Sequence, residues 1–130
     1  MLRREVIAHA TRFLAVYGPQ VRFGRHTQWA AVTDRLDKAL LLAGHAFGSA
    51  QAGAADARLV LADGEKPLTS ASRIRQVTDD RGRTHWTRRR GSCCFLYAFL
   101  YALPGVAHPC ASCPRLSDAE RARILATLPV

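Results

Sequence analysis

The feature that most constrains this chain is a set of four cysteines confined to one short segment. They are Cys93, Cys94, Cys110 and Cys113, and 15 residues separate the second from the third. In a reducing compartment such clustering indicates a metal or redox site before it indicates disulfides. Four thiolates match the ligand count of a [2Fe–2S] cluster and also that of a structural zinc site. We therefore expect these cysteines to bind one metal centre.

The two cysteine pairs differ in what they require of the backbone. In Cys110-x-x-Cys113, two intervening residues let the chain curl so that both sulfurs face one metal. The neighbours Cys93 and Cys94 would point to opposite faces of an extended chain, so they converge only at a sharp turn, which Gly91 would allow. Structural zinc sites generally use spaced pairs. The vicinal pair therefore favours an iron–sulfur cluster mildly, and zinc stays the alternative.

The N-terminal half predicts helices. Apolar residues at spacings of three and four predict a helix over 2–17, which Gly18-Pro19 ends. A second helix is expected over 27–47, with Thr27 as its cap. The Ala/Gly-rich stretch 50–55 is typical of a loop, and 58–62 fits either a short strand or a helical turn.

The C-terminal half predicts one hairpin and one helix. Residues 73–78 and 83–90 flank the turn sequence Asp79-Asp80-Arg81-Gly82, a combination typical of a β-hairpin. Ser117 and Glu120 have capping-box spacing, so a final helix should run to Leu128.

Together these elements predict an α+β fold in a single domain, since 130 residues of which 48% are hydrophobic suffice for one core. We expect residues 1–55 to be mainly helical and 56–90 to be mixed, with the hairpin. Residues 91–116 would form the cluster-binding segment and 117–130 the C-terminal helix.

Charge is the second constraint on function. The chain has 19 Lys and Arg residues against 10 acidic residues, a net charge of +9, and only Lys38 and Lys66 are lysines. No helix-turn-helix, zinc-finger or RNA-binding motif accompanies this charge, so nucleic acid is not the expected partner. The longest uncharged run, 93–107, contains Pro104 and Gly105 and is too short to span a membrane. A peripheral membrane contact stays open.

The cysteine segment also has a recognisable order of motifs. It reads Arg90-Gly91-Ser92-Cys93-Cys94, then Leu103-Pro104-Gly105, then Cys110-Ala111-Ser112-Cys113-Pro114. In this order the chain resembles the C-terminal part of the FhuF-type ferric siderophore reductases, and the stretch from Trp29 to Phe47 resembles the helix that precedes the cluster region in that family.

The resemblance implies that all four cysteines bind a [2Fe–2S] cluster that reduces ferric siderophore iron by one electron in the cytoplasm, at the expense of an electron donor. Such a cluster is anionic and becomes more negative on reduction. Arg88, Arg89 and Arg90 directly precede the ligands, so they would offset this charge and attract an anionic siderophore or an acidic donor.

The chain departs from the family in two respects. Its central link is longer, and a tandem repeat of Phe-Leu-Tyr-Ala over 95–102 accounts for most of the excess. The chain is also shorter than family members at its N-terminal end. We therefore predict that the chain binds the cluster. Whether it also turns over as a reductase stays open. The alternatives are a truncated remnant without turnover and a zinc-stabilised module that contacts nucleic acid or a protein.

Overall fold

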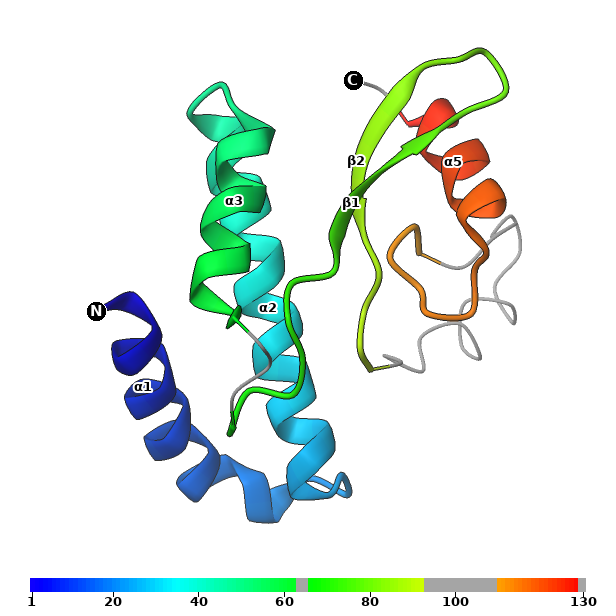
Figure 1. The fold of residues 1–130 in the computed structure, drawn as a ribbon. Coiled ribbons are helices and arrows are strands. Elements are labelled where there is room, and N and C mark those ends of the chain that lie inside the picture. Colours follow the sequence, from blue (N-terminus) through cyan, green and yellow to red (C-terminus); the bar gives the residue numbers. More distant parts are fainter. Residues whose placement is uncertain (63–65, 93–109, 129–130) are drawn as a thin grey trace. The chain divides into compact units, whose positions relative to one another are not determined.

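The computed structural model describes residues 1–62, 66–92 and 110–128. The chain divides into two compact units, Met1–Arg73 and Ile74–Val130. The described residues of the first unit are helical, and those of the second form one β-hairpin and one helix (Figure 1). The expected α+β class is confirmed.

The first unit contains α1 (Leu2–Tyr17), the short 3-10 helix η1 (Gly18–Gln20), α2 (Arg25–Ala46) and α3 (Ala50–Val60). The first helix has the predicted bounds. The second begins at Arg25, not at the predicted Thr27, because the extended Gly24 acts as N-cap and its carbonyl accepts a hydrogen bond from the Gln28 N–H at 3.1 Å.

The prediction of a loop at 50–55 was wrong, and α3 occupies it. Ser49 caps this helix by accepting a hydrogen bond from the Ala52 N–H at 3.1 Å. The small residues serve close packing, because a Cβ added to Gly53 would lie 2.4 Å from the Leu40 carbonyl oxygen of α2. The segment 58–62, which fitted either a strand or a helical turn, continues α3 to Val60.

The core of the first unit joins α1, α2 and the segment after α3. Its buried members are Ala10, Trp29, Leu36, Leu61 and Leu68. Polar side chains of α2 fix the following segment to this core. The Thr33 hydroxyl accepts a hydrogen bond from the Thr69 N–H at 3.1 Å, and Asp37 accepts bonds from the Ser72 hydroxyl at 2.7 Å and the Arg73 N–H at 3.1 Å.

The second unit begins with the predicted hairpin. Strands β1 (Ile74–Thr78) and β2 (Thr84–Arg88) pair antiparallel, from Ile74 opposite Arg88 to Thr78 opposite Thr84. Gly82 takes a φ of +74°, which glycine adopts without strain, and its N–H donates to the Asp79 carbonyl at 3.0 Å. The hairpin prediction is confirmed.

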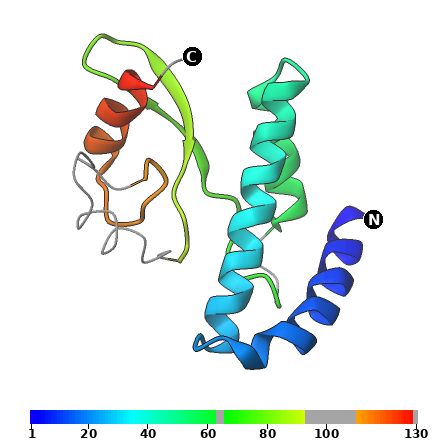
Figure 2. The same ribbon diagram turned by 180° about the vertical axis from the view of Figure 1, so that it is seen from behind.

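Helix α5 (Asp118–Thr127) packs on this hairpin (Figures 1 and 2). Its predicted capping box is present: the Ser117 hydroxyl accepts from the Glu120 N–H at 3.2 Å, and the Ser117 N–H donates to the Glu120 carboxylate at 2.8 Å. The helix ends at Thr127, one residue before the predicted Leu128. Within the described residues of both units, no helix has the length and apolar character needed to cross a membrane.

Candidate metal centre

Two of the four predicted ligands, Cys110 and Cys113, are described by the structure. Cys93 and Cys94 lie outside the described residues, as does most of the predicted cluster-binding segment. The geometry of the site is therefore the geometry of the Cys-x-x-Cys half and of the side chains around it.

The Cys-x-x-Cys segment forms a hydrogen-bonded turn. The Cys113 N–H donates to the Cys110 carbonyl at 2.9 Å, and the Leu116 N–H donates to the Cys113 carbonyl at 3.2 Å. Both thiols are free; Cys113 is buried, whereas Cys110 is partly exposed. A turn of this kind is what the spacing predicts for two sulfurs that share one metal. One covered and one accessible thiol suit a centre at the edge of a small core.

A buried arginine holds this turn in place. Arg121 of α5 is 0% exposed, and its Nε donates to the Ala111 carbonyl at 2.7 Å. Its Nη2 donates to the Cys113 carbonyl at 2.8 Å and approaches the Leu116 carbonyl at 3.5 Å, while Nη1 donates to the Asp118 carboxylate at 3.1 Å. One guanidinium thus connects the turn, the residues after it and the start of the helix.

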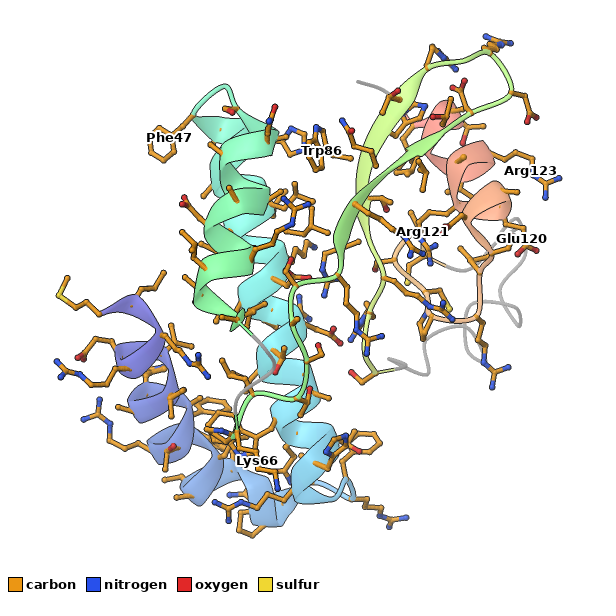
Figure 3. The ribbon with its side chains drawn as sticks, viewed as in Figure 1. Phe47, Lys66, Trp86, Glu120, Arg121 and Arg123 are labelled. Carbon is orange, nitrogen blue, oxygen red and sulfur yellow. The ribbon has the colours of Figure 1, made fainter. Side chains whose placement is uncertain are left out.

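Figure 3 shows how two arginines of α5 differ. Arg121 extends from the helix toward the 110–116 segment, whereas Arg123 points away from it. Burial lowers the pKa of Arg121 from its ordinary value, and the Asp118 carboxylate opposes that shift. A guanidinium stays charged across the physiological range, so a positive charge lies within the unit, next to Cys113.

Sequence reasoning missed Arg121. The signal was present, because Arg121 precedes Ile124 by three residues and Leu125 by four, and so falls on the apolar stripe of the helix. A guanidinium buried on the apolar side of a helix requires hydrogen-bond acceptors, because a buried polar group without a partner is costly. Arg121 finds these acceptors in the carbonyls of Ala111 and Cys113.

The predicted arginine run lies against the same turn at two positions. Arg89 donates from Nη2 to the Pro114 carbonyl at 2.6 Å, and the Arg90 N–H donates to the Ser112 carbonyl at 2.9 Å. Arg88, by contrast, is a buried residue of β2, 6% exposed. The structure therefore brings Arg89 and Arg90 to the cysteine turn and gives Arg88 a place in the hairpin.

Arginine side chains from β1, from α5 and from the end of β2 lie in the unit that contains the turn. Arg75 of β1 and Arg121 both bind one carboxylate oxygen of Asp118. Arg89 and Arg90 follow β2 and contact carbonyls of the turn, Arg89 through its side chain and Arg90 through its backbone N–H. Deprotonated thiols gathered at one point repel one another, and neighbouring guanidinium groups lower the free energy of that arrangement.

Among residues 1–62, 66–92 and 110–128, no group of three or more His, Cys, Asp or Glu side chains is placed to hold a metal ion. Two thiolates are half of the four-ligand set that both a zinc site and a [2Fe–2S] cluster require. The turn and the neighbouring guanidinium groups suit a thiolate-ligated centre, and any further ligands would have to come from outside the described part of the chain.

No protein-family model matches this chain, and no curated protein or solved structure is similar enough to count as a match.

Proposed function

We propose that the second unit binds a [2Fe–2S] cluster and transfers single electrons, with ferric siderophore iron as the acceptor. The observation that carries the proposal is the Cys110–Cys113 turn, which hydrogen bonds from the protein itself build and fix. Cys93 and Cys94 would supply the other two thiolates. The resemblance to FhuF-type reductases supports the cluster type and the substrate.

Bound by these thiolates, the cluster would supply reversible one-electron chemistry. The protein's own part is to present two sulfurs at a fixed separation and to compensate charge. Arg121 would compensate from within the unit and Arg89 from the hairpin side, while the backbone N–H of Arg90 binds the Ser112 carbonyl of the turn. Leu116 and Ile124 pack with Cys113 in one apolar cluster, which keeps water away from this sulfur.

The partners follow from the same charges. Arg89 is exposed, so it would attract an anionic ferric siderophore or an acidic electron donor. The proposed location is the cytoplasm, where thiols remain reduced. A structural zinc module remains the alternative, because a Cys-x-x-Cys turn also suits zinc.

The test is anaerobic purification of the full chain, followed by iron, sulfide and zinc analysis and electron paramagnetic resonance of the dithionite-reduced protein. We expect equal amounts of iron and sulfide and a signal from one unpaired electron. Cys113→Ser should abolish both, whereas Ser112→Ala, between the two cysteines, should retain them. A colourless protein that contains zinc and no sulfide would refute the iron–sulfur proposal and support the structural zinc site.

Turnover is tested separately, by mixing the reduced protein with ferric siderophores and following Fe(II) with a ferrous chelator. We expect one Fe(II) per reduced cluster. If the protein is coloured but reduces no ferric chelate, the proposal of cluster binding stands and the reductase activity is refuted.

The arginines predict a change in potential. Removing positive charge near a centre that becomes more negative on reduction disfavours reduction. The Arg89→Gln/Arg90→Gln double variant should therefore have a lower potential, and Arg81→Gln, in the turn at the other end of the hairpin, serves as the control. Arg88 stays intact because it is buried in β2. Equal potentials for both variants in a redox titration would show that these arginines do not act on the cluster.

A further inference from the structure

The first unit contains a cavity of about 540 Å³ that the proposed metal centre does not use. Residues of α1, of the start of α2 and of the segment 66–69 line it. The volume falls within the range of small-molecule sites. Figure 3 shows Lys66 at this end of the helical unit.

The polar lining of the cavity is basic. Arg25, His26 and Lys66 contribute nitrogen groups, Thr11 and Thr69 contribute hydroxyls, and no described lining residue is acidic. Asp63 and Glu65 lie outside the described residues. Elsewhere in the described chain, Arg75, Arg83 and Arg121 pair with carboxylates. Among the described residues, no ion pair is recorded for Arg25 or Lys66.

The position of α2 adds to this charge. Arg25 and His26 are its first two residues, and no side chain caps its N-terminus. The N-terminal end of a helix carries partial positive charge from its unpaired N–H groups. The side-chain cations and the helix end therefore favour the same sign of ligand charge.

The apolar wall is fixed. Trp29 and Leu68 belong to the buried core cluster, and Pro67 continues the wall beside Leu68. The segment that carries these residues is attached to α2 through the Thr69 N–H and the Thr33 hydroxyl, 3.1 Å apart. A wall anchored in the core provides a preformed surface for an apolar group.

From this combination we propose that the cavity binds a small organic anion. A carboxylate or phosphate of the ligand contacts Arg25 and Lys66, and its apolar ring or chain lies along Trp29 and Pro67. All the described lining residues belong to the first unit, so the argument for this site does not use the cysteine turn or a bound metal.

The probes for the test share one apolar ring and differ in charge: 2-naphthoate, 2-naphthyl phosphate and the neutral 2-naphthalenemethanol, with inorganic phosphate as the anion without a ring. The chain has two tryptophans, so a ¹H–¹⁵N spectrum contains two indole N–H signals. Trp29 lines the cavity and Trp86 belongs to the other unit. Ligand binding should move the Trp29 signal and leave the Trp86 signal in place.

We expect the naphthyl anions to bind about tenfold or more tightly than the alcohol, because charge-assisted hydrogen bonds are the stronger kind. Whichever of the two anions binds more tightly shows whether the site prefers a carboxylate or a phosphate. Arg25→Gln and Lys66→Gln should each weaken anion binding by about three- to tenfold and leave the alcohol unaffected. The matched control is Arg12→Gln, which removes the same charge from an exposed residue of α1 that does not line the cavity.

Three results would overturn the binding of anions at this site, and a fourth would overturn the role of the apolar wall. The first is that the indole N–H signal of Trp29 does not shift with any naphthyl anion at about 5 mM, a concentration at which a ligand with a millimolar Kd would be largely bound. The second is equal affinity for the alcohol and the anions, which would leave a neutral apolar pocket. The third is an equal loss of anion affinity in Arg12→Gln and Arg25→Gln. It would show that the net charge of the protein attracts the anion, and not the side chains that line the cavity. Binding of inorganic phosphate as tight as that of 2-naphthyl phosphate would refute the role of the apolar wall.

Discussion

Replacing Arg121 by methionine tests the internal architecture of the second unit. The substitution keeps a long apolar stem and removes the guanidinium. It thereby eliminates hydrogen bonds of 2.7 Å to the Ala111 carbonyl, 2.8 Å to the Cys113 carbonyl and 3.1 Å to Asp118. Asp118 keeps Arg75 as a partner, so the main loss falls on the two carbonyls.

The expected cost follows from those two carbonyls. Hydrogen bonds to charged groups contribute about 1.5–3 kcal/mol each. A buried acceptor left without a donor costs about 1–3 kcal/mol, so two carbonyls cost roughly 2–6 kcal/mol. A unit of this size has a total stability of roughly 3–9 kcal/mol at ordinary per-residue values. Arg121→Met should therefore bring the metal-free second unit close to unfolding, and Arg121→Lys, which keeps a charge but not the fork of donors, should cost about half as much.

Two measurements on the full chain check this. Urea denaturation gives the free energy of unfolding, and hydrogen exchange read by mass spectrometry localises the loss to peptides that contain the Cys113 and Leu116 amides. Arg123→Met is the matched control, because it makes the same chemical change at an exposed position two residues further along α5. This control should stay within about 0.5 kcal/mol of the parent. Equal stability and equal exchange in the two methionine variants would refute the role assigned to Arg121.

Three further predictions concern local features. Hydrogen bonds from His85 above all, and from the turn N–H groups, hold the pKa of Asp79 well below its ordinary value of 3.8. This carboxylate therefore stabilises the hairpin above about pH 4 and loses that effect as the pH falls toward its folded pKa. In Asp79→Asn, the free energy of unfolding should fall less steeply as the pH is lowered below about 4. A pH dependence equal to that of the parent would contradict the assignment. Gly53→Ala should destabilise the first unit by about 1–3 kcal/mol in a thermal melt, because its Cβ would meet the Leu40 carbonyl, whereas a more stable variant would mean that the two helices separate at little cost. Ser117→Ala removes the cap of α5 and should cost about 0.5–2 kcal/mol by urea denaturation, with no loss if the helix start depends on tertiary contacts alone.

The elements predicted correctly from sequence are those with local chemical causes. The hairpin rests on a turn in which Gly82 supplies a positive φ and Asp79 accepts hydrogen bonds from the N–H groups of Arg81 and Arg83. The start of α5 rests on the reciprocal bonds of Ser117 and Glu120. Each signal lies within five residues, so a single sequence is sufficient to find it.

The misassigned segment depends on a partner far along the chain. Ala and Gly at 50–55 are typical of a loop when considered alone. Against α2 they become a helix interface, because only small side chains allow the backbones of Gly44 and Gly53 to approach this closely. The gain from that approach is tertiary, and local composition does not contain it.

The candidate site shows the same division between local and long-range causes. The spacing Cys110-x-x-Cys113 predicted a turn of the backbone, and a hydrogen-bonded turn is present there. The residues that fix this turn, Arg89 and Arg121, come from a strand end and from a helix, 21 residues before Cys110 and 8 residues after Cys113. Their contacts with the turn are made to backbone carbonyls, which every residue has. The apolar stripe of α5 therefore indicates that Arg121 is buried, but no sequence pattern identifies the turn as its partner. The composition of the site is therefore visible in the sequence, whereas its rigidity comes from arginine–carbonyl bonds that only the fold reveals.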